Sequence, residues 1–295
     1  MATIVRTIYT QGAAYLSGKI LSANETGVPL WLTGIQSANY TKNTPKIDVA
    51  SMGALGSVAK IQTEPTTATM EINLAITTGM LNPAFPTFLG RMVTDTSRPG
   101  PSGITVACSG VGLISGAVLS SVRMEATMGA IPQLAMTFDG FAGPDSYTAN
   151  DPPTTVTSVT LPVVTPYTTG VGGVSVYWFD TNLGHVESVT CPQTVRASWE
   201  MPIERVLCLG TDVNSPTVFS RPPGTMSISV EGLDRRFLDS GQYLTGITIG
   251  AYSIGCANSG VFKETSRTAN LAVGEIGGTF SIVAEGQGLS ATIGG

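Results

Sequence analysis

The sequence predicts an all-β protein built from two tandem copies of one domain, each a β-sandwich or open barrel with a short helix. Three observations predict this fold class. Apolar and polar residues alternate in several segments, the second half resembles the first in order, and turn-forming residues are abundant, with 35 glycines and 18 prolines in 295 residues. Charged residues make up only 12% of the chain, against about 25% in ordinary globular proteins. A disordered chain has fewer apolar residues, and a helical bundle has more Leu, Glu and Lys, so both classes are excluded.

The first half contains two segments with the alternation typical of a strand that buries one face. In Ala68–Ile76, the even positions from Met70 onward are apolar, and most of the odd positions, such as Glu71, are polar. Gln133–Phe141 alternates in the same way. A period of two predicts that each segment has one apolar face and one polar face.

Between these strands lies Gly103–Val122, which carries no charge over 20 residues and in that respect imitates a membrane helix. Glycines and serines interrupt it, and it is rich in Val and Ile, so it predicts two strands joined by a turn and no membrane insertion. The two short helices are expected near Pro83–Leu89 and, in the second half, near Asp234–Leu238.

The second half repeats segments of the first in the same order. Thr225–Leu233 alternates like Ala68–Ile76, and Thr279–Glu285 alternates like Gln133–Phe141. Repeats of this kind indicate stacked or tandem units. The matched segments are Thr7–Gly12 with Thr165–Gly170, Pro45, Ala50 and Ser51 with Pro192, Ala197 and Ser198, Leu55-Gly56 with Leu209-Gly210, Thr69–Ile72 with Thr225–Ile228, Gly103–Val106 with Gly246–Ile249, and Phe138–Gly140 with Ala284–Gly286.

The predicted boundaries follow from these matches. We expect a first β-domain over residues 1–142, a linker over 143–157 and a second β-domain over 158–295. The linker region is rich in Pro, Ser, Thr and Asp, a composition typical of extended connecting segments.

Residues that could carry chemistry are few. The single histidine, His185, lies in a polar, turn-like segment, and the four cysteines are scattered without a Cys-x-x-Cys pair. This pattern predicts neither a hydrolytic triad nor a zinc site. The net charge of −5 gives no basic surface for gripping phosphates. We therefore expect no catalytic residues, no metal and no cofactor, although a pair of carboxylates in a glycosidase-like cleft stays open as an alternative.

The order of segments resembles the major tail tube protein of long-tailed bacteriophages, in a tandem-duplicated form. The resemblance is carried by the Thr-x-Tyr-Thr-x-Gly segment, the Thr-Met-x-Ile strand, the Gly-Ile-Thr-Val strand and the closing strand that ends in Asp-Gly or Glu-Gly. It implies a structural, non-enzymatic virion protein. Three chains would supply six domains to a ring, and stacked rings would form a tube that conducts DNA.

The resemblance also implies partners and a location. The partners would be other copies of the chain in homotrimeric rings, a tape-measure protein, tail terminator and baseplate or distal tail proteins, and double-stranded DNA that passes without specific binding. The protein would be assembled in the host bacterial cytoplasm and would end in the virion tail. About four strands per domain would enter one inner barrel, wide enough for duplex DNA to pass.

Two groups of residues are candidates for function under this resemblance. Polar strand faces supply the candidate lumen-facing residues, and loops supply the candidate contacts between stacked rings. The lumen candidates are Glu71, Asn73, Asp139, Ser227, Ser229, Glu231 and Glu285, and the loop candidates are Arg91, Asp95, Arg98, Asp145 and Asp151.

Alternatives remain open at this point. The polar strand residues would be solvated carboxylates and hydroxyls if their strands lie on the outside, and the loop residues would be ordinary exposed loop residues. The chain as a whole could be another β-rich virion or surface module, such as a baseplate, decoration, or receptor- or sugar-binding protein, or an enzyme on a double β-sandwich.

Overall fold

The computed structural model describes about half of the chain, in both of its halves. The described residues are 14–18, 30–32, 35–50, 52, 56–63, 66–78, 104–108, 111–141, 165–166, 174–180, 185–188, 192–202, 204–206, 218–220, 224–233, 242–250, 252–255, 262–272 and 275–285. Every regular element among them is a β-strand and every strand pair is antiparallel, which confirms the all-β fold class. The expected helices near Pro83–Leu89 and Asp234–Leu238 and the expected linker 143–157 lie outside the described residues.

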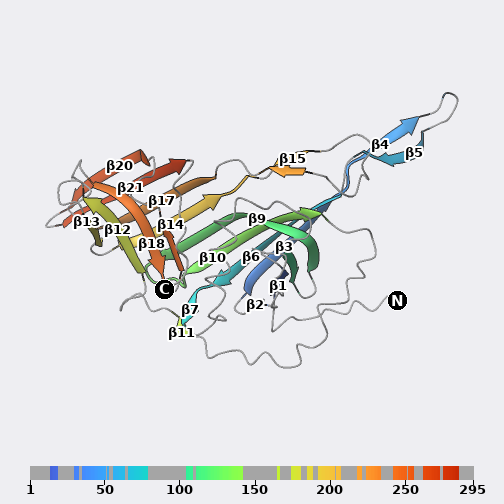
Figure 1. The fold of residues 1–295 in the computed structure, drawn as a ribbon. Helices are drawn as coiled ribbons and strands as arrows, with labels where there is room; N and C mark the ends of the chain where they lie inside the picture. Colours follow the sequence, from blue (N-terminus) through green and yellow to red (C-terminus); the bar gives the residue numbers. More distant parts are fainter. Residues whose placement is uncertain are drawn as a thin grey trace.

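The first layer is a sheet that runs through both halves of the chain (Figure 1). Strand β9 of the first half pairs with β14 of the second, so the two halves share one sheet and are not joined by a linker alone. We call these eight strands the long sheet. In spatial order they are β3 (Ile35–Asn43), β6 (Thr67–Ala75), β10 (Gln133–Phe141), β9 (Gly112–Thr127), β14 (Pro192–Glu200), β17 (Thr225–Leu233), β21 (Glu275–Glu285) and β20 (Phe262–Ala272).

The second layer consists of two smaller groups of strands. One group, β2 (Leu30–Leu32), β1 (Ala14–Gly18) and β8 (Ile104–Cys108), continues into the beginning of β9, which therefore belongs to both layers. The other group is β13 (His185–Ser188), β12 (Val174–Asp180), β18 (Gln242–Ile249) and β19 (Tyr252–Gly255). Strands β8 and β9 occupy the charge-free stretch 103–122, so its interpretation as two strands and a turn is confirmed.

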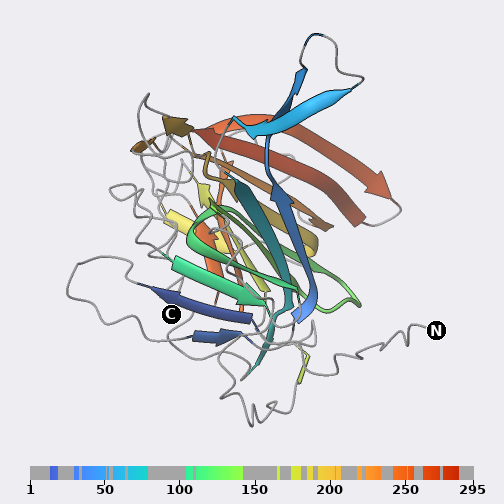
Figure 2. The same ribbon diagram turned by 90° about the vertical axis from the view of Figure 1, so that its right-hand side faces the viewer.

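Three short strand pairs lie outside the two layers. They are the hairpin β4 (Lys46–Ala50) and β5 (Ser57–Gln62), the pair β15 (Glu204–Val206) and β16 (Val218–Ser220), and the pair β7 (Thr77–Thr78) and β11 (Thr165–Pro166). The view in Figure 2 shows the β4–β5 hairpin standing above the sheets.

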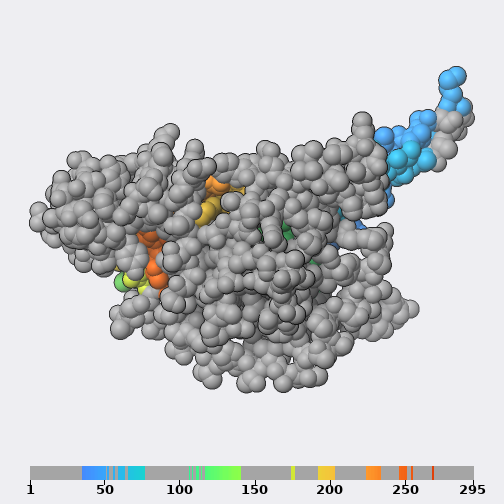
Figure 3. Space-filling view, viewed as in Figure 1, coloured from blue at the N-terminus to red at the C-terminus, as the bar shows by residue number. Residues whose placement is uncertain are grey.

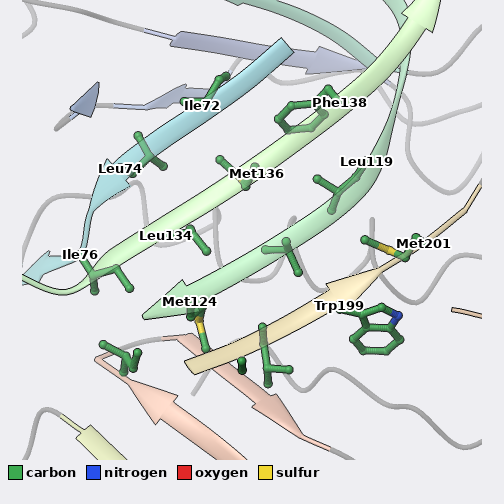
Figure 4. Close-up of a cluster of buried hydrophobic side chains, with 14 of the residues drawn as sticks. Ile72, Leu74, Ile76, Leu119, Met124, Leu134, Met136, Phe138, Trp199 and Met201 are labelled. Carbon is green, nitrogen blue, oxygen red and sulfur yellow. The ribbon is translucent and has the colours of Figure 1, made fainter. Parts of the chain in front are cut away.

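One hydrophobic core lies between the layers and extends through both halves. Met70, Ile72 and Phe138 are completely buried, and Val176 and Ile247 of the second layer belong to the same cluster. Figure 4 shows side chains from neighbouring strands of the long sheet, among them Leu134, Met136 and Trp199, gathered in this core. Fully burying one such side chain contributes roughly 1.5–3 kcal/mol to the free energy of unfolding. Because the core contains residues of both halves, the folding of one half is coupled to that of the other.

The order of strand pairing is the same in the two halves. In the first half the order is β3-β6-β10-β9, and in the second it is β14-β17-β21-β20. The register also agrees, because Thr69 lies opposite Asp139 and Thr225 lies opposite Glu285. This agreement supports the two-copy interpretation, which stays a prediction together with its boundaries.

One of the matched sequence segments does not fit this strand order. Ala50 ends β4 in a hairpin outside the layers, whereas Ala197 lies in the middle of β14 in the long sheet. The match of Ala50 with Ala197 is therefore not a structural equivalence. By strand order, β14 corresponds to β3.

Strand β10 crosses the bent part of β9 at a glycine. A Cβ atom placed on Gly140 would clash with Cγ2 of Ile114 and would lie 3.2 Å from Cα of Ala117. The register between β10 and β9 also shifts between Asp139 and Phe141. The absence of a side chain at Gly140 lets the two strands approach where β9 turns from one layer into the other.

The alternation along β10 gives a test of which face carries the stability. We expect Phe138→Ala to lower the free energy of unfolding by about 3–5 kcal/mol, because it leaves a cavity in the core. Thr137→Ala, one residue away on the polar side of the same strand, should change it by less than about 0.5 kcal/mol. Chemical denaturation of both variants measures the difference, and equal losses would contradict the assignment of faces.

Candidate functional site

The side of the long sheet that faces away from the core is polar, and we call it the polar face. Its residues alternate with the buried ones along each strand and are partly or fully exposed. It is mostly hydroxyl, amide and carboxylate. The polar face comprises Asn39 and Thr41 of β3, Thr69, Glu71 and Asn73 of β6, Thr137 and Asp139 of β10, Arg123 and Glu125 of β9, Arg196, Ser198 and Glu200 of β14, and Ser227, Ser229 and Glu231 of β17.

The structure brings the candidate lumen residues of both halves onto this one surface. Six of the seven lie on the polar face, namely Glu71, Asn73, Asp139, Ser227, Ser229 and Glu231. Glu285 ends β21 opposite Thr225, but its side chain is not among those described. The shared surface is an observation, whereas its role as a tube lining stays a prediction.

The loop candidates lie outside the described residues. The positions concerned are Arg91, Asp95, Arg98, Asp145 and Asp151.

Hydrogen bonds between neighbouring strands organise the polar face. Thr69 Oγ1 donates to Asp139 Oδ1 at 2.5 Å between β6 and β10. Asn73 Nδ2 donates to Ser37 Oγ at 2.8 Å between β6 and β3. Cross-strand pairs of this kind each contribute roughly 0.2–1 kcal/mol, and they hold the polar side chains against the sheet.

An ion-pair cluster that was not predicted lies where the two halves meet. Arg123 Nη2 is 2.7 Å from Glu125 Oε2, and Arg196 Nε is 2.9 Å from Glu125 Oε1. The two arginine side chains are just over half exposed and the Glu125 side chain is 30% exposed. Glu125 thus balances two guanidinium groups, one from its own strand and one from the second half.

A signal for this cluster was present in the sequence. Arg123 and Glu125 flank buried Met124, and Arg196 lies between buried Val195 and Ala197. Alternation would have assigned each residue to a polar strand face. It could not have shown that β9 and β14 are neighbours, because Arg196 and Glu125 are 71 residues apart.

The two ends of the long sheet are open edges within the described part of the chain. On that part, β3 pairs only with β6, and β20 pairs only with β21. These strands are 9 and 11 residues long. Long edge strands offer backbone N–H and C=O groups for pairing with another chain.

Among the described residues, no group of three or more His, Cys, Asp or Glu side chains is placed to hold a metal ion. The described residues also include no helix that is long and apolar enough to cross a membrane. Cys108 is a free, buried cysteine, and burial raises the pKa of its thiol. A protonated, buried thiol is a poor nucleophile. Cys108 is therefore assigned to the hydrophobic core, where its side chain is buried, and not to a reactive site.

A scan against protein-family models found no match for this chain, and a search of curated proteins found no relative. The strand arrangement, the polar face and the open edges are therefore the observations that can support a function.

The ion-pair cluster predicts a salt-dependent loss of stability when Glu125 is neutralised. Glu125→Gln removes the carboxylate that contacts both Arg123 and Arg196 and leaves the two guanidinium groups near each other. We expect the free energy of unfolding to fall by up to about 1 kcal/mol at low salt and the loss to shrink at about 1 M NaCl because salt screens the repulsion. Glu71→Gln on the same face, whose carboxylate makes no ion pair among the described residues, is the control and should show neither effect.

The raised pKa of Cys108 predicts low reactivity and a defined pH dependence. Iodoacetamide at neutral pH should modify this thiol in the unfolded protein and leave it unmodified in the folded protein, as read by peptide mass spectrometry. Because the folded chain favours the neutral thiol, this stabilisation is complete below the pKa of an exposed thiol, about 8.5, and is lost as the pH rises above it. Cys108→Ala should lack that alkaline decline.

Proposed function

We propose that this protein is the structural subunit of a phage tail tube, in which three chains close into a ring and rings stack around a DNA-conducting lumen. The observation that best supports this function is the pairing of β9 with β14. Within one chain, the last strand of the first half-sheet already lies beside the first strand of the second half-sheet.

The same pairing can continue between chains. By strand order, β20 corresponds to β9 and β3 corresponds to β14, and β20 and β3 are the two open edges. A contact between unlike edges is heterologous, and it generates a ring when the rotation closes. Each contact between two half-sheets, within a chain or between chains, would turn the sheet by the same angle. Three chains with two half-sheets each would then close a ring through six such contacts.

The dimensions of such a ring suit a DNA channel. Three chains with eight long-sheet strands each supply about 24 strands, which at a spacing of about 4.8 Å and a tilt of about 40° give a circumference of about 150 Å. The backbone diameter is then about 48 Å, and about 38 Å remains after side chains, by the same geometry. Duplex DNA is narrower than this opening.

The layering favours the polar face as the lining. The second layer covers the apolar side of the long sheet. In a closed ring the outer circumference is longer than the inner one, so the second layer has more room if it lies on the outside. The polar face is then the inner surface. Among the described side chains of this face, the charged groups are five carboxylates and two guanidinium groups, and both guanidinium groups contact Glu125.

This lining would let DNA slide. Proteins that grip DNA neutralise phosphates with Lys and Arg and release counterions. The polar face is rich in Ser, Thr and Asn and has more carboxylates than guanidinium groups. Such a face would repel the DNA phosphates and would not bind the DNA bases. Under this proposal the tape-measure protein would occupy the lumen before the DNA, while terminator and baseplate or distal tail proteins would meet the two ends of the tube in the virion tail.

The register of the β9–β14 junction defines the register expected between chains. Arg196 lies opposite Ser229 in the second half. Ser229 corresponds to Asn73, because Thr225 corresponds to Thr69, and Asn73 lies opposite Ser37. Ser37 on the β3 edge therefore corresponds to Arg196.

The other edge follows in the same way. Glu125 lies opposite Gln133, which corresponds to Thr279, and Thr279 lies opposite Thr268. Thr268 on the β20 edge therefore corresponds to Glu125. Since Glu125 lies opposite Arg196 within the chain, we expect Thr268 of one chain to lie opposite Ser37 of the next.

Cysteine cross-linking tests both the ring and its register. The double variant Ser37→Cys, Thr268→Cys should form disulfides between chains, because directly opposed Cβ atoms are about 4.5–5.5 Å apart, and non-reducing electrophoresis should show a covalent trimer. The control variant Ser37→Cys, Arg267→Cys moves one cysteine to the adjacent position of the strand. Side chains at adjacent positions point to opposite faces of a sheet, so this control should cross-link much less. Electron microscopy and native mass spectrometry should show rings of three chains. Dispersed monomers at every concentration would overturn the proposed function.

A further inference from the structure

Two orders of the half-sheets are open to one chain. The four-stranded half-sheets have the edges β3 and β9 in the first half and β14 and β20 in the second. The chain joins β9 to β14 and leaves β3 and β20 as open edges of the described part. The reversed order would join β20 to β3 and leave β9 and β14 outside. Because the covalent connection brings the same two halves together in either order, some other feature must distinguish the edges.

The apolar sides of β3 and β14 are similar and do not distinguish them. Each strand has an alanine and, two residues later, an aromatic residue, opposite the Ile and the Met of the repeated Thr-Met-x-Ile segment. The opposed pairs are Ala38–Ile72 and Tyr40–Met70 in the first half, and Ala197–Ile228 and Trp199–Met226 in the second. All eight residues belong to the hydrophobic core or pack against it. A neighbouring strand would therefore meet much the same apolar surface on β3 as on β14.

The polar sides of the same edges differ in charge. Arg196 of β14 corresponds to Ser37 of β3, and Glu125 of β9 corresponds to Thr268 of β20. Where β9 meets β14, Glu125 contacts Arg196 at 2.9 Å and Arg123 at 2.7 Å. Ser37 and Thr268 are exposed hydroxyl residues. The junction inside the chain is thus charged at this register, whereas a β20–β3 junction is uncharged.

An exposed ion pair is enough to favour one order over the other. Such a pair adds little to stability, but specificity depends only on the difference in free energy between two pairings. In the reversed order Glu125 and Arg123 would stay on one strand, while Arg196 would lie on an open edge without this carboxylate. The Glu125–Arg196 contact is therefore the part of the cluster that only the observed order allows.

The open edge of the first half is also suited to accept another chain. Charged side chains on an edge strand discourage pairing with a further strand. The described polar-face residues of β3 carry no charge, namely Ser37, Asn39 and Thr41. The charged positions of the polar face at this register lie instead on β9 and β14, where each strand already has a neighbour on both sides.

We propose that the Arg123–Glu125–Arg196 cluster selects β9 and β14 as the junction inside each chain and thereby reserves the β20 and β3 edges for a second copy of the chain. The inference rests on the proposed function for the contact between copies. It adds to that function which of the two kinds of junction in the ring each chain makes by itself.

Disulfide trapping in dilute protein, where chains do not meet, measures the choice. Thr127→Cys with Thr194→Cys reports the observed order, because these residues lie opposite each other between β9 and β14. Ser37→Cys with Thr268→Cys reports the reversed order when the disulfide forms within one chain. We expect the first pair to be oxidised in most molecules and the second pair in few, as read by peptide mass spectrometry of the monomer band.

Removing the ion pair should weaken the choice. Glu125→Thr with Arg196→Ser gives the β9–β14 junction the residues found at the equivalent positions of β20 and β3. In this background the share of molecules with an intrachain 37–268 disulfide should rise about two- to fivefold, the range that one exposed ion pair supports. About 1 M NaCl should raise the share in the chain that keeps the pair, because salt screens it, and should have no effect in the variant.

A matched control removes an ion pair elsewhere. Asp48→Thr with Lys60→Thr deletes one acid and one base that are 3.6 Å apart and more than 60% exposed. They lie on the β4–β5 hairpin, which stands clear of the other described residues in Figure 3. The share of the 37–268 disulfide should stay unchanged in this variant.

The outcomes separate this inference from the ring proposal. A share that stays unchanged both in the Glu125→Thr, Arg196→Ser variant and at high salt would overturn the inference and leave the ring proposal intact. The salt series needs no change to the cluster, so it decides the question even if the variant folds poorly. If the share shifts as expected but electron microscopy of concentrated protein shows no rings, the proposed function fails while the selection of β9 and β14 within the chain stands.

Discussion

The backbone pairing of β9 with β14 joins the two halves of the chain into one sheet. Strand β9 has 16 residues and pairs with β8 at its start, with β10 along its second part and with β14 near its end. It therefore links the two layers of the first half and links that half to the second. Gly140 is part of this arrangement, because only a residue without a side chain fits where β10 crosses the bend.

Pairing across the halves determines which surfaces are covered. Because the long sheet is continuous, its apolar side forms one core with both groups of the second layer. Its other side becomes one polar surface drawn from both halves. The low charge of the chain, 12% of residues, is consistent with this division, since the polar face uses hydroxyl and amide groups more often than charges. The Arg123–Glu125–Arg196 cluster lies where β9 meets β14, and in it Glu125 of the first half forms an ion pair with Arg196 of the second half.

The same pairing leaves the sheet edges on which the proposed ring depends. Joining the halves through β9 and β14 leaves β3 and β20 as unlike edges, which suits repeated addition of further chains. The hairpin at one end and the β9–β10 turn at the other expose most of the large apolar side chains that the described part of the molecule leaves uncovered.

Which residues share a face of a strand could be predicted from the amino-acid sequence. Alternation in Ala68–Ile76 and Gln133–Phe141 predicted the buried positions Met70, Ile72 and Phe138 and the polar position Glu71, because the period of two is a property of the extended backbone alone. Which strands pair with each other could not be predicted in this way and became visible in the folded chain. Ala50 matches Ala197 in sequence yet lies in a hairpin and not in the long sheet. The Glu125–Arg196 pair depends on two strands that meet across 71 residues. Partner choice between strands comes from burial summed over the whole core, and no local pattern contains that sum.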